Sequence, residues 1–578
     1  MNINIKTIII FLSSICFLAT SCVDDILDKK PQDIFGDKDL WTSSKLVDAY
    51  VVNLYSSSRF GGILNDGESV SLITTSDEAI NGMPHSGTHS INRGVLTASN
   101  DFNQYWDYEL IRRINFFLEN YSQSTLESEF LATRASEVRF LRAYAYFEMV
   151  KRYGGIPLIT KVQNINEGDA LFVLRNTEEE VYDFIISECQ EAANGLPDFF
   201  YNIDEGRITK FVALSLLSRA AIYAASIAEN GSPIIDPNGR VGIPSNKAKI
   251  YYTQSMEASD KIIESGKFNL YDKYADRAAN YQNIFLDNQS NPEVIFWKKY
   301  VPKIAGHSYD WYQTKQKVTM AISAEMINSY EMLDHSDPVV DFVNAKGNLN
   351  TLLQKKDPRL HASVLWNGRV WRGAEIKSYK GVIDEINGQE VKMIDRNKDY
   401  KGMAQQGANF SENLATGFSV LKYLDPTVEV PLIGEGGTDY AVFRYAEILL
   451  NKAEAAFKLD KNSIATDALN EVRQRAGLQV LTSVNMAQII NERKVELAFE
   501  EHRYYDIRRW RIAEKEIAKD IHSVYAFYDF RISDYVYESF AAGNMTGSRK
   551  FLKQHYYLPI MPDKISKNPK LTENPGYK

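Results

Sequence analysis

Apolar residues recur every three or four positions over long parts of the chain, which is the spacing of an amphipathic helix. In the first half, this pattern predicts helices at 41–56, 104–121, 137–153, 177–195, 208–228 and 247–265. A Gly-Gly-Ile-Pro sequence at 154–157 ends the third of these, and a capping box from Thr177 to Glu180 begins the fourth. We therefore expect the N-terminal half to be a series of packed helices.

The pattern changes between about residues 266 and 438. Short β-prone runs at 293–297 and 362–366 stand among turns rich in Gly and Asn. Helical spacing then returns at 439–459, at 465–478 and from Asn485 to about Trp510. The first two of these form a helix hairpin that resembles a tetratricopeptide unit, without a strict 34-residue repeat. Binding residues are expected in the loop-rich middle, because long loops commonly carry them.

The first 22 residues have the pattern of an export signal. Lys6 precedes an apolar run from Ile8 to Ala19, which is shorter than the roughly 20 residues that span a bilayer. Small residues then lead to Cys22, which resembles the lipidated cysteine of a lipobox, although its usual Leu stands one step further out, at position 18. This predicts a signal peptide at 1–21, lipidation of Cys22 and an extended tether at 22–40. The alternative is a plain secretory signal that is cleaved elsewhere.

Charge and cysteine content narrow the range of possible functions. The formal net charge is −9 with both signs interspersed, which gives no electrostatic basis for binding nucleic acid. Of three cysteines, Cys16 lies in the predicted signal and Cys22 is the predicted anchor, so only Cys189 remains and no internal disulfide is expected. Cys189 lies on a predicted helix and is expected to be a small buried apolar residue. The alternative, a catalytic thiol, has no nearby His to support it.

Several motifs stand in one order along the chain. They are R-A-Y-A-Y-F-E-M-V-K-R-Y-G-G-I-P-L (142–158), R-Y-A-E-I-L-L-N-K-A-E-A (444–455), A-L-N-E-V-R-Q-R-A-G (468–477), E-R-K-V-E-L-A-F-E-E-H-R-Y-Y-D-I-R-R-W (492–510) and the Y-Y-L-P-I-M-P-D-K segment that opens 556–577. With T-S-D-E-A at 75–79 and the start at Cys22, they make the chain resemble the SusD/RagB family of outer-membrane nutrient-binding lipoproteins.

This resemblance implies a mainly α fold. Four irregular tetratricopeptide-like helix pairs would form a scaffold, with a loop-rich, small-strand ligand-binding region packed on it. The expected division is an N-terminal helical region at 41–230 and a C-terminal region at 231–578, the latter with a loop-rich part (266–438), a helical part (439–515) and a final segment (516–578). Family members sit on the outer face of the outer membrane, capture oligosaccharides or, in some cases, peptides, and pass them to a SusC-like TonB-dependent transporter. They are not enzymes and need no cofactor.

The charged residues of the family motifs are expected to be structural. On 492–510, Glu492, Glu496 and Glu500 follow one another at helical spacing against an apolar face, which predicts ion pairs inside the scaffold. The same interpretation applies to Arg444, Glu447 and Glu454. A direct contact with ligand is the alternative.

Aromatic residues on loops are the main ligand-binding candidates. A sugar site needs flat aromatic rings for apolar C–H faces and a few polar groups for the hydroxyls. Three candidates share the segment 307–313, two flank a predicted hairpin turn in N-G-R-V, and one opens a helix. They are Tyr309, Trp311 and Tyr312; Trp366 and Trp371; and Trp106. For each of them, packing in the core is the alternative.

Polar and metal candidates are fewer. Asp77, Glu78 and Arg93 bracket a Gly/His/Asn-rich loop and could contact a ligand, or the loop could simply be solvated. Oxygen ligands at Asp395, Asn397 and Asp399 have calcium-like spacing, but the turn glycine and closing Glu of such a loop are absent from the pattern. An ordinary polar turn is the alternative there.

Three functions remain open from the sequence. The first is a glycan-binding lipoprotein that works with a transporter, and the second is a binder of peptides or another nutrient with the same partner. The third is a glycoside hydrolase with two carboxylates about 5–9 Å apart. No motif selects such a pair among the 75 acidic residues.

Overall fold

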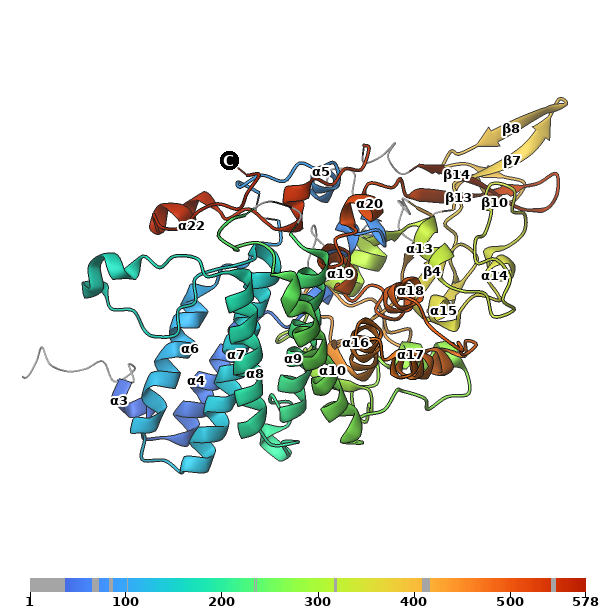
Figure 1. Ribbon diagram of the computed structural model, residues 1–578. Helices are drawn as coiled ribbons and strands as arrows, with labels where there is room; N and C mark the ends of the chain where they lie inside the picture. The colour runs from blue at the N-terminus through green and yellow to red at the C-terminus, as the bar shows by residue number, and fades with distance from the viewer. Residues whose placement is uncertain are drawn as a thin grey trace, which may run out of the picture.

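The computed structural model describes residues 37–64, 72–82, 87–100, 102–232, 234, 236–316, 320–407, 416–541 and 547–577. The predicted signal peptide, Cys22 and most of the tether lie outside these residues. The described chain is mainly α-helical with short strands, as the sequence predicts (Figure 1).

The scaffold is a layer of antiparallel helices that runs through both halves of the chain (Figure 1). In this layer α7 packs on α8, α8 on α9, α9 on α10, and α10 on α16, which pairs with α17; α4 and α6 cover α7. All six predicted N-terminal helices are confirmed. The members are α4 (Ser44–Ser57), α6 (Tyr108–Asn120), α7 (Ser128–Tyr153), α8 (Glu178–Gly195), α9 (Lys210–Asn230), α10 (Ala248–Glu264), α16 (Tyr445–Lys458) and α17 (Asn462–Ala476).

Helix α9 is the centre of this layer. Small residues let its neighbours approach closely, and the Ser218 hydroxyl lies 2.9 Å from that of Ser259 on α10 and accepts a hydrogen bond from Asn451 on α16. Within the described residues, α9 is the one helix with the length and hydropathy of a membrane span, but its apolar segment is wholly buried inside the protein. Cys189 on α8 is also fully buried, as predicted.

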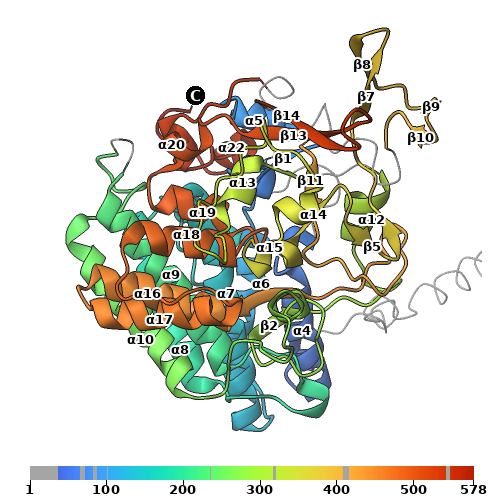
Figure 2. The ribbon, with the colours of Figure 1, turned by 90° about the vertical axis from the view of Figure 1, so that its right-hand side faces the viewer.

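The described strands form two small sheets and three pairs, which combine the loop-rich part with strands from before residue 266 and after residue 438. One sheet has the antiparallel order β1 (Ala79–Asn81), β3 (Met320–Ile322), β11 (Phe418–Val420), β4 (Val364–Trp366). The other has the order β14 (Asp534–Ala541), β13 (His522–Asp529), β7 (Gly381–Ile386), β8 (Gln389–Met393), with β13 parallel to β7 (Figures 1 and 2). The pairs are β2 (Val294–Lys298) with β12 (Tyr440–Arg444), β5 (Val370–Trp371) with β6 (Ala374–Glu375), and β9 (Asp399–Tyr400) with β10 (Met403–Ala404).

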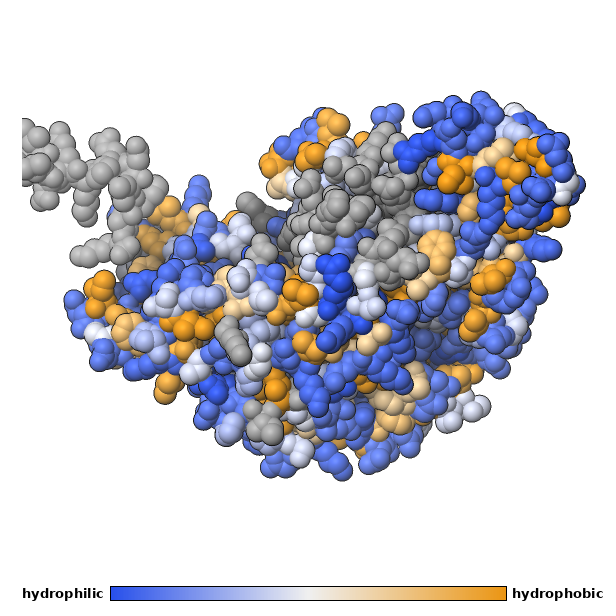
Figure 3. Space-filling view, turned by 90° about the horizontal axis from the view of Figure 1, so that it is seen from above, coloured by the Kyte–Doolittle hydropathy of each residue, from blue (hydrophilic) through white to orange (hydrophobic). Residues whose placement is uncertain are grey.

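The remaining α-helices that the structure describes are shorter than those of the scaffold. They are α3 (Asp37–Leu40), α5 (Gly87–Asn92), α11 (Arg277–Asn283), α12 (Tyr309–Trp311), α13 (Ala324–Ser329), α14 (Leu349–Leu352), α15 (Pro358–Ser363), α18 (Met486–Glu496), α19 (His502–Arg509), α20 (Ala513–Ile517) and α22 (Pro562–Lys567). Apolar side chains on the upper face are scattered among polar ones (Figure 3).

Four predicted elements were wrong in their bounds. The predicted helix 137–153 begins nine residues earlier, at Ser128. The predicted helix 439–459 begins as strand β12, because its first residues pair with β2. The predicted strand 362–366 begins only at Val364, after α15. The predicted helix from Asn485 to Trp510 is broken at 497–501, where Phe499 and Glu501 have positive φ. The Phe499 N–H donates to Glu78, and Lys422 donates to the Ala498 carbonyl, so distant side chains replace helical hydrogen bonds there.

A buried ion-pair cluster joins the helices to the loop-rich region. The Glu496 carboxylate bonds to Arg444 at 2.6 Å, to Arg359 at 2.9 Å and to Arg475. Burial alone would raise the pKa of Glu496, but the arginines outweigh burial and lower that pKa well below its usual value. The structural role predicted for this motif residue is confirmed.

The cluster extends through the other motif residues. Arg444 also binds Glu293 and Glu500, each at 2.8 Å, and Lys422 binds Glu500 at 2.9 Å. Glu492 also belongs to the cluster, because it binds Arg359 together with Glu496, and it binds Arg473 as well. Further along the scaffold, two other motif acids form separate buried pairs, Glu447 with Arg219 and Glu454 with Arg509.

We predict that Glu496→Gln destabilises the protein by about 3–5 kcal/mol, because three buried arginines lose a shared counter-charge. Urea unfolding measures the loss. Glu516→Gln is the matched control, since Glu516 pairs with a Lys519 that is half exposed, and the change there should stay below about 1 kcal/mol. Equal losses in the two variants would show that the cluster does not stabilise the fold.

Candidate functional site

The segment 307–316 is anchored to the loop-rich region by its first residues. Ser308 Oγ accepts a hydrogen bond from the Gly434 N–H, and the Tyr309 hydroxyl donates to the Lys422 carbonyl at 3.2 Å. Tyr309 is therefore turned inward, with 2 % of its surface exposed, and Tyr312 is also buried. Trp311, between them on α12, stays partly exposed. Of the three predicted aromatics in this segment, Trp311 is the one available to a ligand.

Trp371 lies on the hairpin β5–β6. The predicted turn in N-G-R-V is present, with the Arg369 N–H donating to the Trp366 carbonyl at 3.3 Å, but it does not close a hairpin, because β4 pairs with β11 and β5 with β6. The two-residue hairpin turn is Arg372–Gly373. Both turn residues have positive φ, +48° and +78°, as in a type I′ turn, whose twist fits a tight hairpin. The turn projects the Arg372 guanidinium back over the Trp371 ring, with Cζ 4.9 Å from the ring centroid.

One ion pair joins these two segments. The Arg372 Nη2 lies 2.5 Å from Asp310 Oδ2, and the same nitrogen donates to the Asp425 carbonyl at 2.8 Å. Helix α12 and strand β5 consequently lie side by side (Figure 2). We call Asp310, Trp311, Trp371 and Arg372 the aromatic surface. Trp371 and Asp310 are buried in its base, so core packing is the correct alternative for Trp371, whereas Trp311 and Arg372 are partly exposed. The exposed part combines an indole ring with a guanidinium, which are groups that bind the C–H faces and hydroxyls of a sugar.

The sequence analysis missed Asp310 and Arg372. Each is the sequence neighbour of a predicted tryptophan, which is the one local signal that could have pointed to them. Asp310 and Arg372 are 62 residues apart, and no local sequence pattern indicates that they form a pair.

The other predicted tryptophans lie elsewhere. Trp366 is buried, with 2 % exposed, and its indole N–H donates to Asn350 at 2.8 Å, so core packing is the correct alternative for it. Trp106 is partly exposed before α6 in the helical half, where its ring packs against Tyr108 and Tyr153 at centroid distances of 5.4 and 5.2 Å. A ligand role for Trp106 stays a prediction.

Asp77 and Glu78 are buried scaffold contacts, so the expectation of a solvated or ligand-facing loop was wrong for both. Asp77 binds Arg503 at 2.7 Å and Lys494 at 3.0 Å. Burial would raise the pKa of Asp77, but these two cations lower it far below its usual value. Arg93 is exposed and donates to Ser90 at the end of α5, and its role toward a ligand stays a prediction.

Family comparisons identify the chain. The family model described as the SusD family matches residues 267–577, and a second, described as starch-binding associating with outer membrane, matches residues 25–222. The chain belongs to the SusD family.

Relatives resemble this SusD-family protein over most of its length. A SusD-like protein of Bacteroides ovatus is 24 % identical over 529 residues, covering 88 % of this chain and 83 % of the relative. A SusD-like protein structure from Bacteroides fragilis has a TM-score of 0.72 at 25 % identity, covering 95 % of this chain and all of the other. A SusD-like carbohydrate binding protein of the same species has a TM-score of 0.70 at 23 % identity, covering 92 % and 100 %.

Calcium binding by this SusD-family protein stays a prediction. Asp395 accepts the Asn397 N–H at 3.0 Å and pairs with Lys398 at 3.2 Å, and Asp399 begins the short strand β9. Among the residues that the structure describes, no three or more His, Cys, Asp or Glu side chains gather as a metal site.

Glu78 gives a pH-dependent test of the scaffold. Burial raises the pKa of Glu78 from 4.5 to about 7, despite the hydrogen bond from the Phe499 N–H. Between these pH values the folded state binds more protons than the unfolded state, so stability falls as the pH rises. The titration of Glu78 should lower the free energy of unfolding by about 3 kcal/mol between pH 4.5 and 8, and we predict that this loss is absent in Glu78→Gln. Urea unfolding of both proteins across this range measures it, and parallel stability curves would contradict it.

Proposed function

We propose that this protein is a cell-surface lipoprotein that binds oligosaccharides at the aromatic surface and passes them to a SusC-like TonB-dependent transporter, without catalysis. The observation that carries the proposal is the Asp310–Arg372 pair, which holds Trp311 beside the Trp371 hairpin. The partly exposed Trp311 ring would stack on the C–H face of a sugar. The partly exposed Arg372 guanidinium beside it, held in place by Asp310, would donate hydrogen bonds to hydroxyl groups.

The comparisons support this proposal. The N-terminal match is described as starch-binding and associated with the outer membrane, and one structural relative is described as carbohydrate binding. SusD-family proteins work with SusC-like transporters. Binding through stacking and hydrogen bonds is reversible, which suits a protein that must release its ligand to a partner.

We predict that Trp311→Ala lowers affinity for the bound oligosaccharide at least tenfold, with a nearly unchanged melting temperature, because the ring is partly exposed. Calorimetric titration measures the affinity, using a ligand first selected from a glycan panel. Trp297→Ala is the control: this tryptophan is also partly exposed, but on β2, and its loss should leave affinity unchanged.

The same panel separates the alternatives. Retention of glycan without product supports the proposal. Binding of peptides but not glycans would favour a peptide carrier, and cleavage of a glycan would show a hydrolase and overturn the proposal.

The anchoring part of the proposal rests on the sequence alone. We predict that Cys22→Ser moves the protein from the membrane to the soluble fraction, because the acyl chains attach at this cysteine. Asp24→Ala with Asp25→Ala should leave the protein in the membrane but shield it from protease added to whole cells, since acids after the lipidated cysteine resemble the surface-export signal. Unchanged protease access would contradict that role.

A further inference from the structure

A separate cavity lies between the two halves of the chain. Its volume of about 590 Å³ is within the range of small-molecule sites. Helices α7 and α9 line one side, and β12, the break at 497–501 and α19 line the other. The lining residues include none of the aromatic surface, so the cavity is a second place where a ligand could bind.

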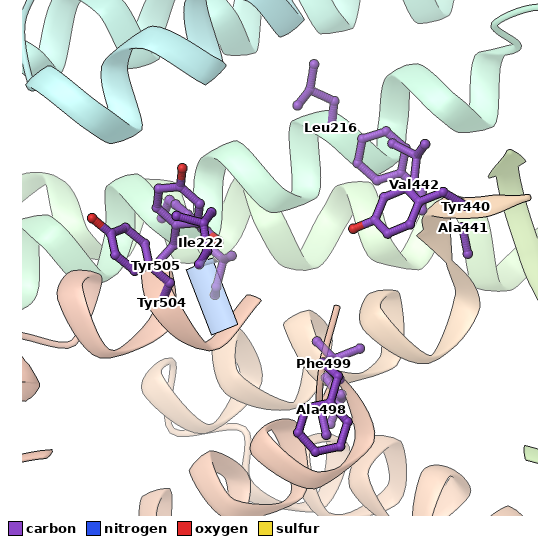
Figure 4. Close-up of a cluster of buried hydrophobic side chains, with 14 of the residues drawn as sticks. Leu216, Ile222, Tyr440, Ala441, Val442, Ala498, Phe499, Tyr504 and Tyr505 are labelled. Atoms are coloured by element: carbon purple, nitrogen blue, oxygen red, sulfur yellow. The ribbon is translucent and has the colours of Figure 1, made fainter. Parts of the chain in front are cut away.

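Five aromatic rings line the cavity. Tyr440 and Tyr505 come from β12 and α19, with α9 running behind them (Figure 4). Both hydroxyls are fixed: that of Tyr440 donates to the Glu500 carbonyl and that of Tyr505 accepts from Asn103. The remaining rings are those of Phe60, Tyr144 and Tyr223. Such rings offer flat faces to the C–H groups of a sugar.

The polar part of the lining is rich in cations. Lys151 Nζ lies 2.5 Å from Glu148 and 4.3 Å from the Tyr505 ring centroid. Arg152 binds the same Glu148 at 2.6 Å. Arg219 uses Nε to bind Glu447 at 2.6 Å and Nη2 to bind the Glu447 carboxylate and a backbone carbonyl. The single negative charge of Glu148 therefore balances only one of the two positive charges of Lys151 and Arg152.

Further cations lie around the cavity and act on its lining residues. His502, which also lines it, has its pKa held well below the usual value by burial and then by Arg219, Arg493, Arg444 and Lys151. The negative charge of Glu500 is neutralised by its ion pairs with Arg444 and Lys422. At the partly exposed rim, Arg59 and Glu501 have opposite charges.

We propose that this cavity binds one sugar residue that carries a carboxylate, a hexuronate. The carboxylate lies against Lys151, and the ring packs on the tyrosines. Burial lowers the pKa of Lys151 to about 8, so its amine is still mainly protonated at pH 7. A neutral sugar would leave this desolvated cation without an added partner. The site goes beyond the proposed function, because the aromatic surface makes no use of these residues.

The test is calorimetric titration of the full mature chain with galacturonate and with galactose, its neutral counterpart. We expect one galacturonate per protein, with galactose at least tenfold weaker. Lys151→Gln should weaken galacturonate binding at least tenfold and keep its fold, because Glu148 retains Arg152. Lys151→Arg keeps the charge and should retain binding.

The Trp311→Ala variant separates binding in the cavity from binding at the aromatic surface. Trp311→Ala should leave galacturonate binding unchanged, and its loss in that variant would assign the ligand to the aromatic surface and overturn this inference. Absence of saturable galacturonate binding, equal affinity for galactose, or full affinity in folded Lys151→Gln would also overturn it. If Lys151→Gln does not fold, the galacturonate–galactose contrast in the unaltered protein decides.

Discussion

Three arginines share one buried carboxylate, Glu496, and the rest of the structure depends on this arrangement. Arg359 comes from α15 in the loop-rich region, Arg444 from the junction of β12 and α16, and Arg475 from α17. Charges removed from water are tolerated only when they are fully paired, so none of these elements can move away without leaving a bare buried ion. The cluster thus fixes the position of the loops relative to the helices.

The ion-pair cluster also fixes the position of the aromatic surface, because hydrogen bonds and the chain itself connect the two. Glu500 binds Lys422, and the backbone carbonyl of Lys422 accepts the Tyr309 hydroxyl. Asp310 and Trp311 follow directly in the chain. A ligand surface built on loops therefore has a rigid base, and its tryptophan needs little ordering when a ligand arrives, which limits the entropic cost of binding.

Much of the scaffold was predictable because its signals are local. Helical spacing and the capping box at Thr177 depend on residues within one or two turns, and the structure confirms them. The break at 497–501 was not predictable, since its backbone groups bond to Glu78 and Lys422, far away in sequence. The same holds for the burial of Asp77 and for the Asp310–Arg372 pair, whose chemistry exists only after the chain has folded.

Helix α9 has a consequence for the chain before it folds. Unfolded, its 21 residues have the length and hydropathy of a segment that partitions into lipid. Arg219 lies near the middle of the segment, and a central arginine opposes insertion by about 2.5–3.5 kcal/mol. The guanidinium that binds Glu447 in the folded protein thus also biases the nascent segment toward water, so one side chain serves both solubility during synthesis and packing afterwards.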